Sequence, residues 1–153
     1  MKVLVTGESG FIAENLIRVL KKRGHTPIVI HDSNLSRIKT GEVCVHRNSH
    51  EQWAFHLKNL GGDLVVHNAA VVGTDVVALN PTEATLTNVS GTYNIVRACN
   101  DVNIPICYLG TTVIYDTAKY QEETIVESSD LRPTTFYGIQ KLAGEQIVTT
   151  HSK

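Results

Sequence analysis

The sequence predicts an α/β fold in which a doubly wound parallel sheet forms one domain over residues 1–153. Short runs of β-branched residues alternate with longer helical stretches, a spacing that is typical of βαβ units. The runs do not alternate apolar with polar residues, so we expect strands buried on both faces, as in parallel sheets. A turn with two glycines, at residues 7 and 10, joins the first strand to the first helix.

The elements follow from the hydrophobic pattern. The first helix carries Ile12, Leu16, Val19 and Leu20 on one face, and Gly24 then stops it. Residues 116–134 form a polar, irregular stretch between the last strand and the last helix. We expect strands at residues 2–6, 28–30, 42–46, 64–67 and 104–109, and helices at 11–22, 51–60, 81–100 and from 137 onward.

Composition narrows the function classes. The chain has 153 residues, of which 42% are hydrophobic and 19% charged, and its formal charge is −1. This near-neutral balance gives no reason to expect a nucleic-acid partner or a membrane surface. The sequence contains no apolar run of membrane-spanning length and no secretory signal pattern. Three scattered cysteines do not suggest a disulfide framework. We therefore expect a cytoplasmic protein in a reducing compartment.

The glycine turn reads Thr6-Gly-Glu-Ser-Gly-Phe-Ile-Ala13, with the spacing G-x-x-G-x-x-A. Gly7 allows a tight turn, Gly10 allows the backbone to approach a pyrophosphate, and Ala13 allows close packing between helix and strand. A phosphate would then lie at the positive end of the helix. The alternative is an ordinary glycine turn. The position directly after a strand favours a dinucleotide site made of Gly7, Ser9, Gly10, Phe11 and Ile12.

Residues 1–25 resemble the start of the extended short-chain dehydrogenase/reductases, the NAD-dependent nucleotide-sugar epimerase/dehydratase family. That family carries T-G-x-x-G-x-x-G at this place, and Ala13 replaces its last glycine. The resemblance implies a Rossmann-type NAD(P)-binding fold. It covers almost the whole chain but only the first half of the family's length. We therefore expect a truncated domain that lacks the usual C-terminal substrate domain.

His31 and Asp32 follow the expected second strand, where the family usually places an acidic residue against the adenosine ribose. A carboxylate there would accept a hydrogen bond from the ribose 2′-hydroxyl and favour NAD. Arg37 lies nearby and would meet a 2′-phosphate instead, so NADP remains an alternative. Asp32 could also be an ordinary loop or capping carboxylate.

Two further segments resemble the family's cofactor and active-site segments. After the fourth strand, His67 is followed by Asn68, Ala69 and Ala70, whose counterparts line the cofactor. Residues 88–95 match N-x-x-G-T-x-N-[IVL], and Asn88 matches an asparagine that helps to order the active site. On their own, the first segment would be a small-residue strand end and Asn88 an exposed helix residue.

The strongest catalytic resemblance lies near the C-terminus. Thr111 matches the family's catalytic Ser or Thr, whereas Thr112 and Val113 replace the Asp-Glu pair of dehydratases, which argues against water elimination. Tyr137 and Lys141 match Y-x-x-x-K. The resemblance implies that Tyr137 exchanges a proton with the substrate, that Thr111 holds its oxygen, and that Lys141 binds the nicotinamide ribose. We expect the ammonium and the positive charge of the cofactor together to lower the pKa of the phenol. Alone, the pair would be a solvated helix face.

Two other patterns are weaker. His46, His50 and His56 do not share an assured face and have no cysteine or acidic cluster beside them, so we expect no metal site. The family usually has an aspartate near residues 46 and 47 that contacts adenine, and this chain has Arg47 there. Trp53 and Phe55 are most simply packing residues of one helix.

The sequence therefore predicts a nucleotide-sugar epimerase or related oxidoreductase that uses NAD, with NADP possible. The alternative is a non-catalytic NAD(P)-binding or protein-interaction module that retains the fold. The expected partners are a nucleotide-sugar substrate and either a second copy in a homodimer or a chain that completes the missing C-terminal half. Such a partner would cover the fifth strand, which otherwise forms an exposed sheet edge.

Overall fold

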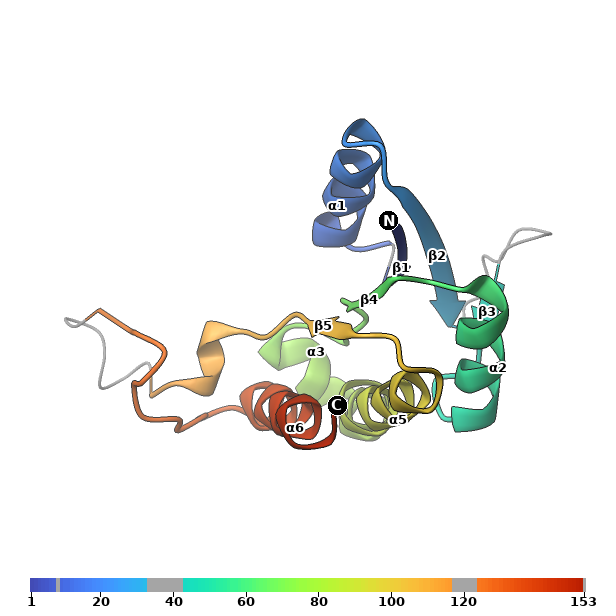
Figure 1. Ribbon diagram of the computed structural model, residues 1–153. Coiled ribbons are helices and arrows are strands. Elements are labelled where there is room, and N and C mark those ends of the chain that lie inside the picture. The colour runs from blue at the N-terminus through green and yellow to red at the C-terminus, as the bar shows by residue number, and fades with distance from the viewer. Residues whose placement is uncertain (8, 33–42, 117–123, 153) are drawn as a thin grey trace.

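The fold is a five-stranded parallel sheet with helices on both faces, as expected (Figure 1). The computed structural model describes residues 1–7, 9–32, 43–116 and 124–152. The strand order is β3-β2-β1-β4-β5, so the chain moves outward in one direction and then returns to the other side of β1. The strands are β1 (Lys2–Thr6), β2 (Thr26–Asp32), β3 (Val43–Val45), β4 (Leu64–His67) and β5 (Ile106–Tyr108).

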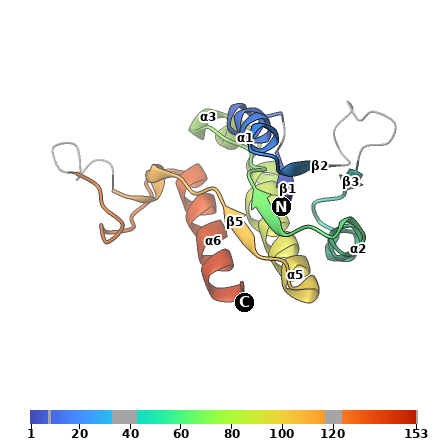
Figure 2. The same cartoon turned by 45° about the horizontal axis from the view of Figure 1, so that its top comes forward.

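The helices divide between the two faces of the sheet (Figures 1 and 2). Helix α1 packs on one face, where Ala13 meets Val3, Val5 and Val66. Helices α2 and α5 pack on the other, against Leu4 and its neighbours. Consecutive residues of β1 thus point into different cores, which explains why the strand carries no polar face. The helices are α1 (Phe11–Lys22), α2 (His50–Leu60), α3 (Thr74–Leu79), α4 (Pro81–Thr85), α5 (Thr92–Val102) and α6 (Phe136–His151).

The expected helix over residues 81–100 contains a π-helical segment, η1 (Leu86–Gly91), between α4 and α5. A π turn widens the helix by one residue per turn and often marks a functional position. Gly91 closes this segment, and a Cβ there would lie 3.3 Å from the Leu86 carbonyl oxygen and 3.5 Å from Cβ of Arg47. The glycine therefore lets the helix approach the loop after β3 closely.

The other differences from the expected elements involve only a few residues each. Strand β2 extends to Thr26 and Asp32, beyond the expected 28–30, because its ends pair with β1 and β3. Strand β5 is shorter than expected, and η2 (Thr112–Ile114) forms one 3₁₀ turn after it. Helix α3 was not expected, since six residues are too few to show a hydrophobic period. None of the helices described here is long and apolar enough to cross a membrane.

Candidate active and cofactor site

The glycine loop packs directly against the end of β4. Gly7 has φ +72°, and a Cβ there would lie 2.7 Å from the backbone N and Cα of Ala69. Both the backbone conformation and the contact therefore require glycine at this position. The side chain of Asn68 donates to the Gly7 carbonyl at 3.1 Å, and Gly10 N donates to the same oxygen at 3.1 Å. These bonds hold the loop in place below the first turn of α1.

The N-terminus of α1 suits an anion. Its N-cap is Gly10, and no side chain in the described part of the chain caps it. By contrast, Ser49 caps α2 and Thr135 caps α6 through their hydroxyl oxygens. The first residues of α1 also face outward, since Phe11 is 82% exposed and Ile12 55%. Backbone N–H groups at such a terminus bind phosphate through hydrogen bonds and the helix dipole.

A cavity of about 270 Å³ runs from this loop along the carboxyl ends of β1, β2 and β4. Ligands of open α/β sheets bind at this edge, where the strand order reverses. Its volume lies just below the range of about 300–1,000 Å³ that is typical of small-molecule sites. Its lining includes Thr6, Gly7, Ser9, Ile30, Arg47, Trp53, His67, Ala69, Ala70, Val71, Glu83, Thr87 and Gly91.

The hydroxyl of Thr6 anchors the strand ends at this cavity. Its oxygen accepts hydrogen bonds from the backbone N–H of Asn68 at 3.2 Å and of Ala69 at 3.1 Å. Both lone pairs are then used, so the hydroxyl proton is directed to Nδ1 of His67, 2.9 Å away. The small residues after β4 are thereby fixed against the end of β1.

His67 extends this series of hydrogen bonds from the sheet to the helices. Because Nδ1 accepts, Nε2 carries the proton and donates to the hydroxyl of Thr92 at 3.1 Å. Thr92 in turn donates to the carbonyl of Asn88 at 2.8 Å. Burial and the nearby charge of Lys141 lower the pKa of His67 to about 3. His67 is therefore neutral at physiological pH, as the chain of hydrogen bonds requires.

Asn88 is buried, with 1% of its surface exposed, so it is not an exposed helix residue. Its side-chain oxygen accepts from Val71 N at 2.8 Å, and its amide donates to Val71 O at 2.9 Å. The amide also donates to the side-chain oxygen of Gln140 at 2.9 Å. Asn88 thus ties the segment after β4 to α6, next to Lys141.

Thr111 and Tyr137 meet at the carboxyl end of β5. Helix α6 begins at Phe136, and a Cβ on Gly138 would lie 2.6 Å from the Val113 carbonyl oxygen, so glycine lets the helix start against η2. Burial raises the pKa of Tyr137, and a hydrogen bond with the Thr111 hydroxyl partly opposes that rise. Burial therefore keeps the phenol protonated at neutral pH, and the expected lowering of its pKa by the ammonium and the cofactor's charge together stays a prediction.

The ammonium of Lys141 has other partners in the structure. Its ammonium donates to the Leu109 carbonyl at 2.7 Å and lies 4.2 Å from the centre of the Tyr108 ring. Lys141 is 5% exposed, and burial lowers its pKa to about 8, partly opposed by the charge of Glu145. Sequence reasoning missed Tyr108, Gln140 and Glu145, because their roles arise only from the packing of α6 on β5.

Other expected site residues are less completely described. His31 is half-buried on β2, opposite Cys44 of β3. The side chain of Asp32 and the whole of Arg37 lie outside the described residues. His50 contacts Asp101 at 2.7 Å, and His46 Nδ1 accepts from Asn48 N at 3.2 Å. No group of three or more metal-ligating side chains occurs within the described ranges. Trp53 is 5% exposed and Phe55 63%, as core and surface packing require.

Comparison with known proteins agrees with this geometry. The sequence model of the NAD dependent epimerase/dehydratase family matches residues 3–153. A GDP-6-deoxy-D-talose 4-dehydrogenase of Aggregatibacter actinomycetemcomitans is 30% identical over 155 residues, which cover 99% of this chain and 48% of that protein. A probable low-salt glycan biosynthesis reductase of Haloferax volcanii is 27% identical over 150 residues, covering 97% and 49%.

Solved structures show the same fold. MoeE5 in complex with UDP-glucose and NAD has a TM-score of 0.82 and 25% identity, over 99% of this chain and 49% of that one. The UDP-glucose 4-epimerase of Thermus thermophilus, in complex with NAD, has a TM-score of 0.84 and 23% identity, over 98% and 50%. The chain thus spans about half the length of the relatives it matches. With the family match over nearly every residue, this chain belongs to the NAD dependent epimerase/dehydratase family.

Proposed function

We propose that the chain binds NAD and carries the proton-transfer residues of a nucleotide-sugar epimerase or related oxidoreductase. One observation carries this proposal: Gly138 lets the start of α6, with Tyr137, pack against η2 next to Thr111, and Lys141 lies about one helical turn farther along α6. Thr111 and Tyr137 come from the end of β5 and from α6, elements that the sequence separates by a long irregular stretch. The cavity at the glycine loop lies at the same edge of the sheet.

The residues at this edge fit a dinucleotide. Gly7, Ser9, Gly10, Phe11 and Ile12 would hold the pyrophosphate at the uncapped N-terminus of α1. Ala69 and Ala70 present no bulky side chain where the cofactor would cross the end of β4. His31 or Asp32 would contact the adenosine ribose, and Lys141 the nicotinamide ribose. NADH, when bound, supplies a hydride from carbon 4 of its nicotinamide.

The protonation states favour one direction of proton transfer. Tyr137 has a raised pKa, so its neutral phenol is ready to donate a proton to a substrate carbonyl oxygen. Thr111 would hold that oxygen by a second hydrogen bond. With the hydride that bound NADH would supply, donation of the Tyr137 proton to this oxygen would complete the reduction of the ketone to an alcohol. Asn88 and Gln140 keep α6 in register with the segment after β4, which positions Lys141.

The direct test is Tyr137→Phe. We expect the dissociation constant of NADH, measured by fluorescence, to stay within about twofold, since the phenol contributes little to cofactor binding. Deuteride transfer from labelled NADH to a nucleotide-activated keto sugar, followed by mass spectrometry, should fall by about 10²–10⁴-fold because the proton donor is lost.

Tyr93→Phe is the matched control, since Tyr93 lies on α5 against Arg97 and His151, away from the cavity lining. Undiminished transfer in Tyr137→Phe would contradict the assigned role. NADH binding without transfer by the unaltered chain to any of a panel of keto sugars would instead support the non-catalytic module.

A further inference from the structure

The lining of the cavity includes an ion pair. Arg47 follows β3 and Glu83 lies in α4, and their side chains form an ion pair. Arg47 is only 13% exposed, whereas Glu83 is 62% exposed. Both residues line the cavity. The carboxylate is therefore held at the cavity by a largely buried guanidinium, yet remains accessible from solvent.

The backbone of Arg47 is fixed from two sides. Its carbonyl oxygen accepts from the indole N–H of Trp53 at 3.4 Å and from the side-chain amide of Asn94 at 3.2 Å. Segment η1 packs beside Arg47, since a Cβ on Gly91 would lie at an ordinary contact distance of 3.5 Å from Cβ of Arg47. Because the backbone of Arg47 is held in place, its guanidinium can orient the carboxylate of Glu83.

Glu83 belongs to a single helical face. Glu83, Thr87 and Gly91 all line the cavity and are spaced by four residues, about one helical turn. The hydroxyl of Thr87 donates to the Glu83 carbonyl at 3.0 Å, which couples the two turns. This helical face forms one side of the cavity. Ala69 and Ala70, which follow β4, also line the cavity.

The remaining lining suits a flat aromatic ring. Ile30, Trp53, Ala69, Ala70 and Val71 supply apolar surface to the same cavity as the glycine loop and the ion pair. If the phosphates lie at the loop, as proposed above, the base of the nucleotide occupies this apolar part. Its edge then faces Arg47 and Glu83.

The chemistry of this pair differs from that of a lone aspartate. The family resemblance leads one to expect an acidic residue near position 47 that contacts adenine, and an arginine in its place has donors only. An ionised carboxylate has acceptors only, whereas the adenine edge offers an amino donor beside a ring-nitrogen acceptor. Arg47 alone cannot accept from that amino group, but the pair supplies both kinds of partner.

We propose that Glu83, oriented by Arg47, accepts a hydrogen bond from the exocyclic amino group of the adenine and thereby selects adenine dinucleotides. This inference rests on the proposed NAD binding and adds the residue that reads the base. Hypoxanthine carries a carbonyl oxygen where adenine carries the amino group. That oxygen would face the carboxylate without a proton between them, which costs binding.

The test compares the dissociation constants of NADH and reduced nicotinamide hypoxanthine dinucleotide, both measured by fluorescence on the full chain. We expect the unaltered protein to prefer NADH by about tenfold to hundredfold. Glu83→Gln should bring this preference to within about threefold of equality, because a glutamine amide can accept from one base and donate to the other. Thermal unfolding verifies that the variant is folded.

Glu51→Gln is the matched control, because Glu51 is an exposed carboxylate on α2 that does not line the cavity. The preference of the Glu51→Gln variant for NADH should equal that of the unaltered protein. Equal affinities in the unaltered protein, or an undiminished preference in Glu83→Gln, would overturn the role of Glu83 and leave NAD binding intact. If neither dinucleotide binds, the proposed function fails together with this inference.

Discussion

Lys141 shows at the scale of one residue how burial changes a side chain's chemistry. Its ammonium contacts the Leu109 carbonyl and the Tyr108 ring, and burial lowers its pKa to about 8 from the usual 10.5 of a lysine. An unfolded lysine keeps its proton to higher pH than this folded one. Between pH 8 and 10 the unfolded chain therefore binds more protons, and Lys141 makes the fold more stable as pH rises.

This linkage predicts the behaviour of Lys141→Met, which keeps the length of the side chain but removes the titrating group. Between pH 8 and 9.5 the free energy of unfolding should rise for the unaltered protein, relative to the variant, by about 2 kcal/mol. Urea unfolding at several pH values measures this difference. Lys58→Met, at an exposed position on α2, should show no such change. A pH-independent difference for Lys141→Met would show that the proton stays bound.

At the scale of elements, the contact between α6 and β5 depends on Gly144. A Cβ on Gly144 would lie 2.3 Å from the Tyr108 hydroxyl oxygen, and the hydroxyl donates to the Lys141 carbonyl at 3.4 Å. Tyr108 is rigid and lies beside the Lys141 ammonium, so it cannot move away cheaply. The glycine therefore sets the distance between the helix and the strand on which the candidate catalytic residues are placed.

We expect Gly144→Ala to destabilise the protein by about 1–2 kcal/mol, because overpacking outweighs the gain of about 1 kcal/mol in helix propensity. Adding Tyr108→Phe removes the nearest atom and should restore part of the loss. Chemical unfolding of the two single variants and the double variant gives the coupling energy. Additive effects would mean that α6 accommodates the methyl group by another route.

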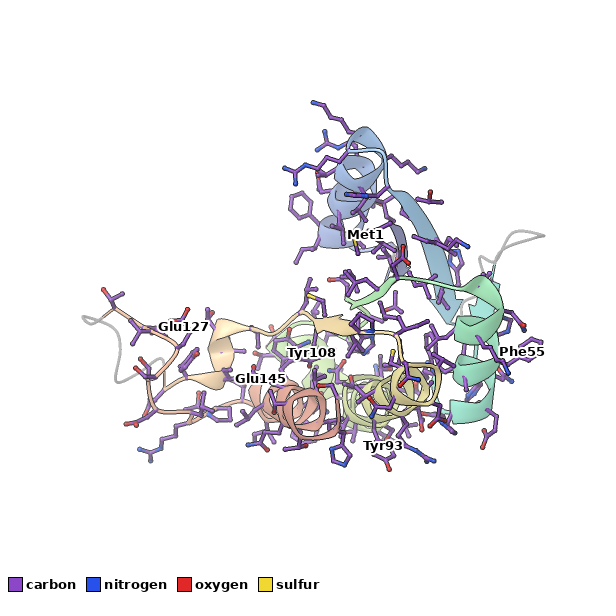
Figure 3. The ribbon with its side chains drawn as sticks, in the orientation of Figure 1. Met1, Phe55, Tyr93, Tyr108, Glu127 and Glu145 are labelled. Atoms are coloured by element: carbon purple, nitrogen blue, oxygen red, sulfur yellow. The ribbon has the colours of Figure 1, made fainter. Side chains whose placement is uncertain are left out.

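The hydrogen-bond chain through His67 acts at the scale of the whole molecule, since it joins β1, β4 and the helical layer. Figure 3 shows the labelled Tyr108 between β5 and α6, and its ring centre lies 5.9 Å from that of His67. The pKa of His67 is lowered to about 3 from 6.5. Below pH 6.5 the unfolded chain therefore binds the proton that the folded chain excludes, and stability falls as pH falls.

His67→Gln should remove this acid sensitivity, because an amide accepts and donates without titrating. Between pH 6.5 and 4.5 we expect the unaltered protein to lose about 2 kcal/mol of unfolding free energy relative to this variant. Thermal unfolding across this range provides the measurement, and His56→Gln on α2 is the control. Parallel curves for the unaltered protein and His67→Gln would mean that His67 titrates normally.

The sequence correctly predicted the order of the main strands and helices, the burial of the sheet and the position of the glycine loop. It failed at α3, which is too short to show a period, and at η1, where the helical pattern continues through the π segment. Through the family resemblance it also singled out Thr111, Tyr137, Lys141 and Asn88, whose catalytic roles stay predictions.

By itself, the sequence determined the features that depend on neighbouring residues: hydrophobic period, strand burial and the glycines of the first turn. Tertiary structure alone decided which charges and hydrogen bonds face one another. Lys141 contacts Leu109 and Tyr108, and Glu83 pairs with Arg47 across 36 positions of the chain. The physical reason is that a pKa and an ion pair depend on burial and on partners brought together by packing, which local patterns do not encode.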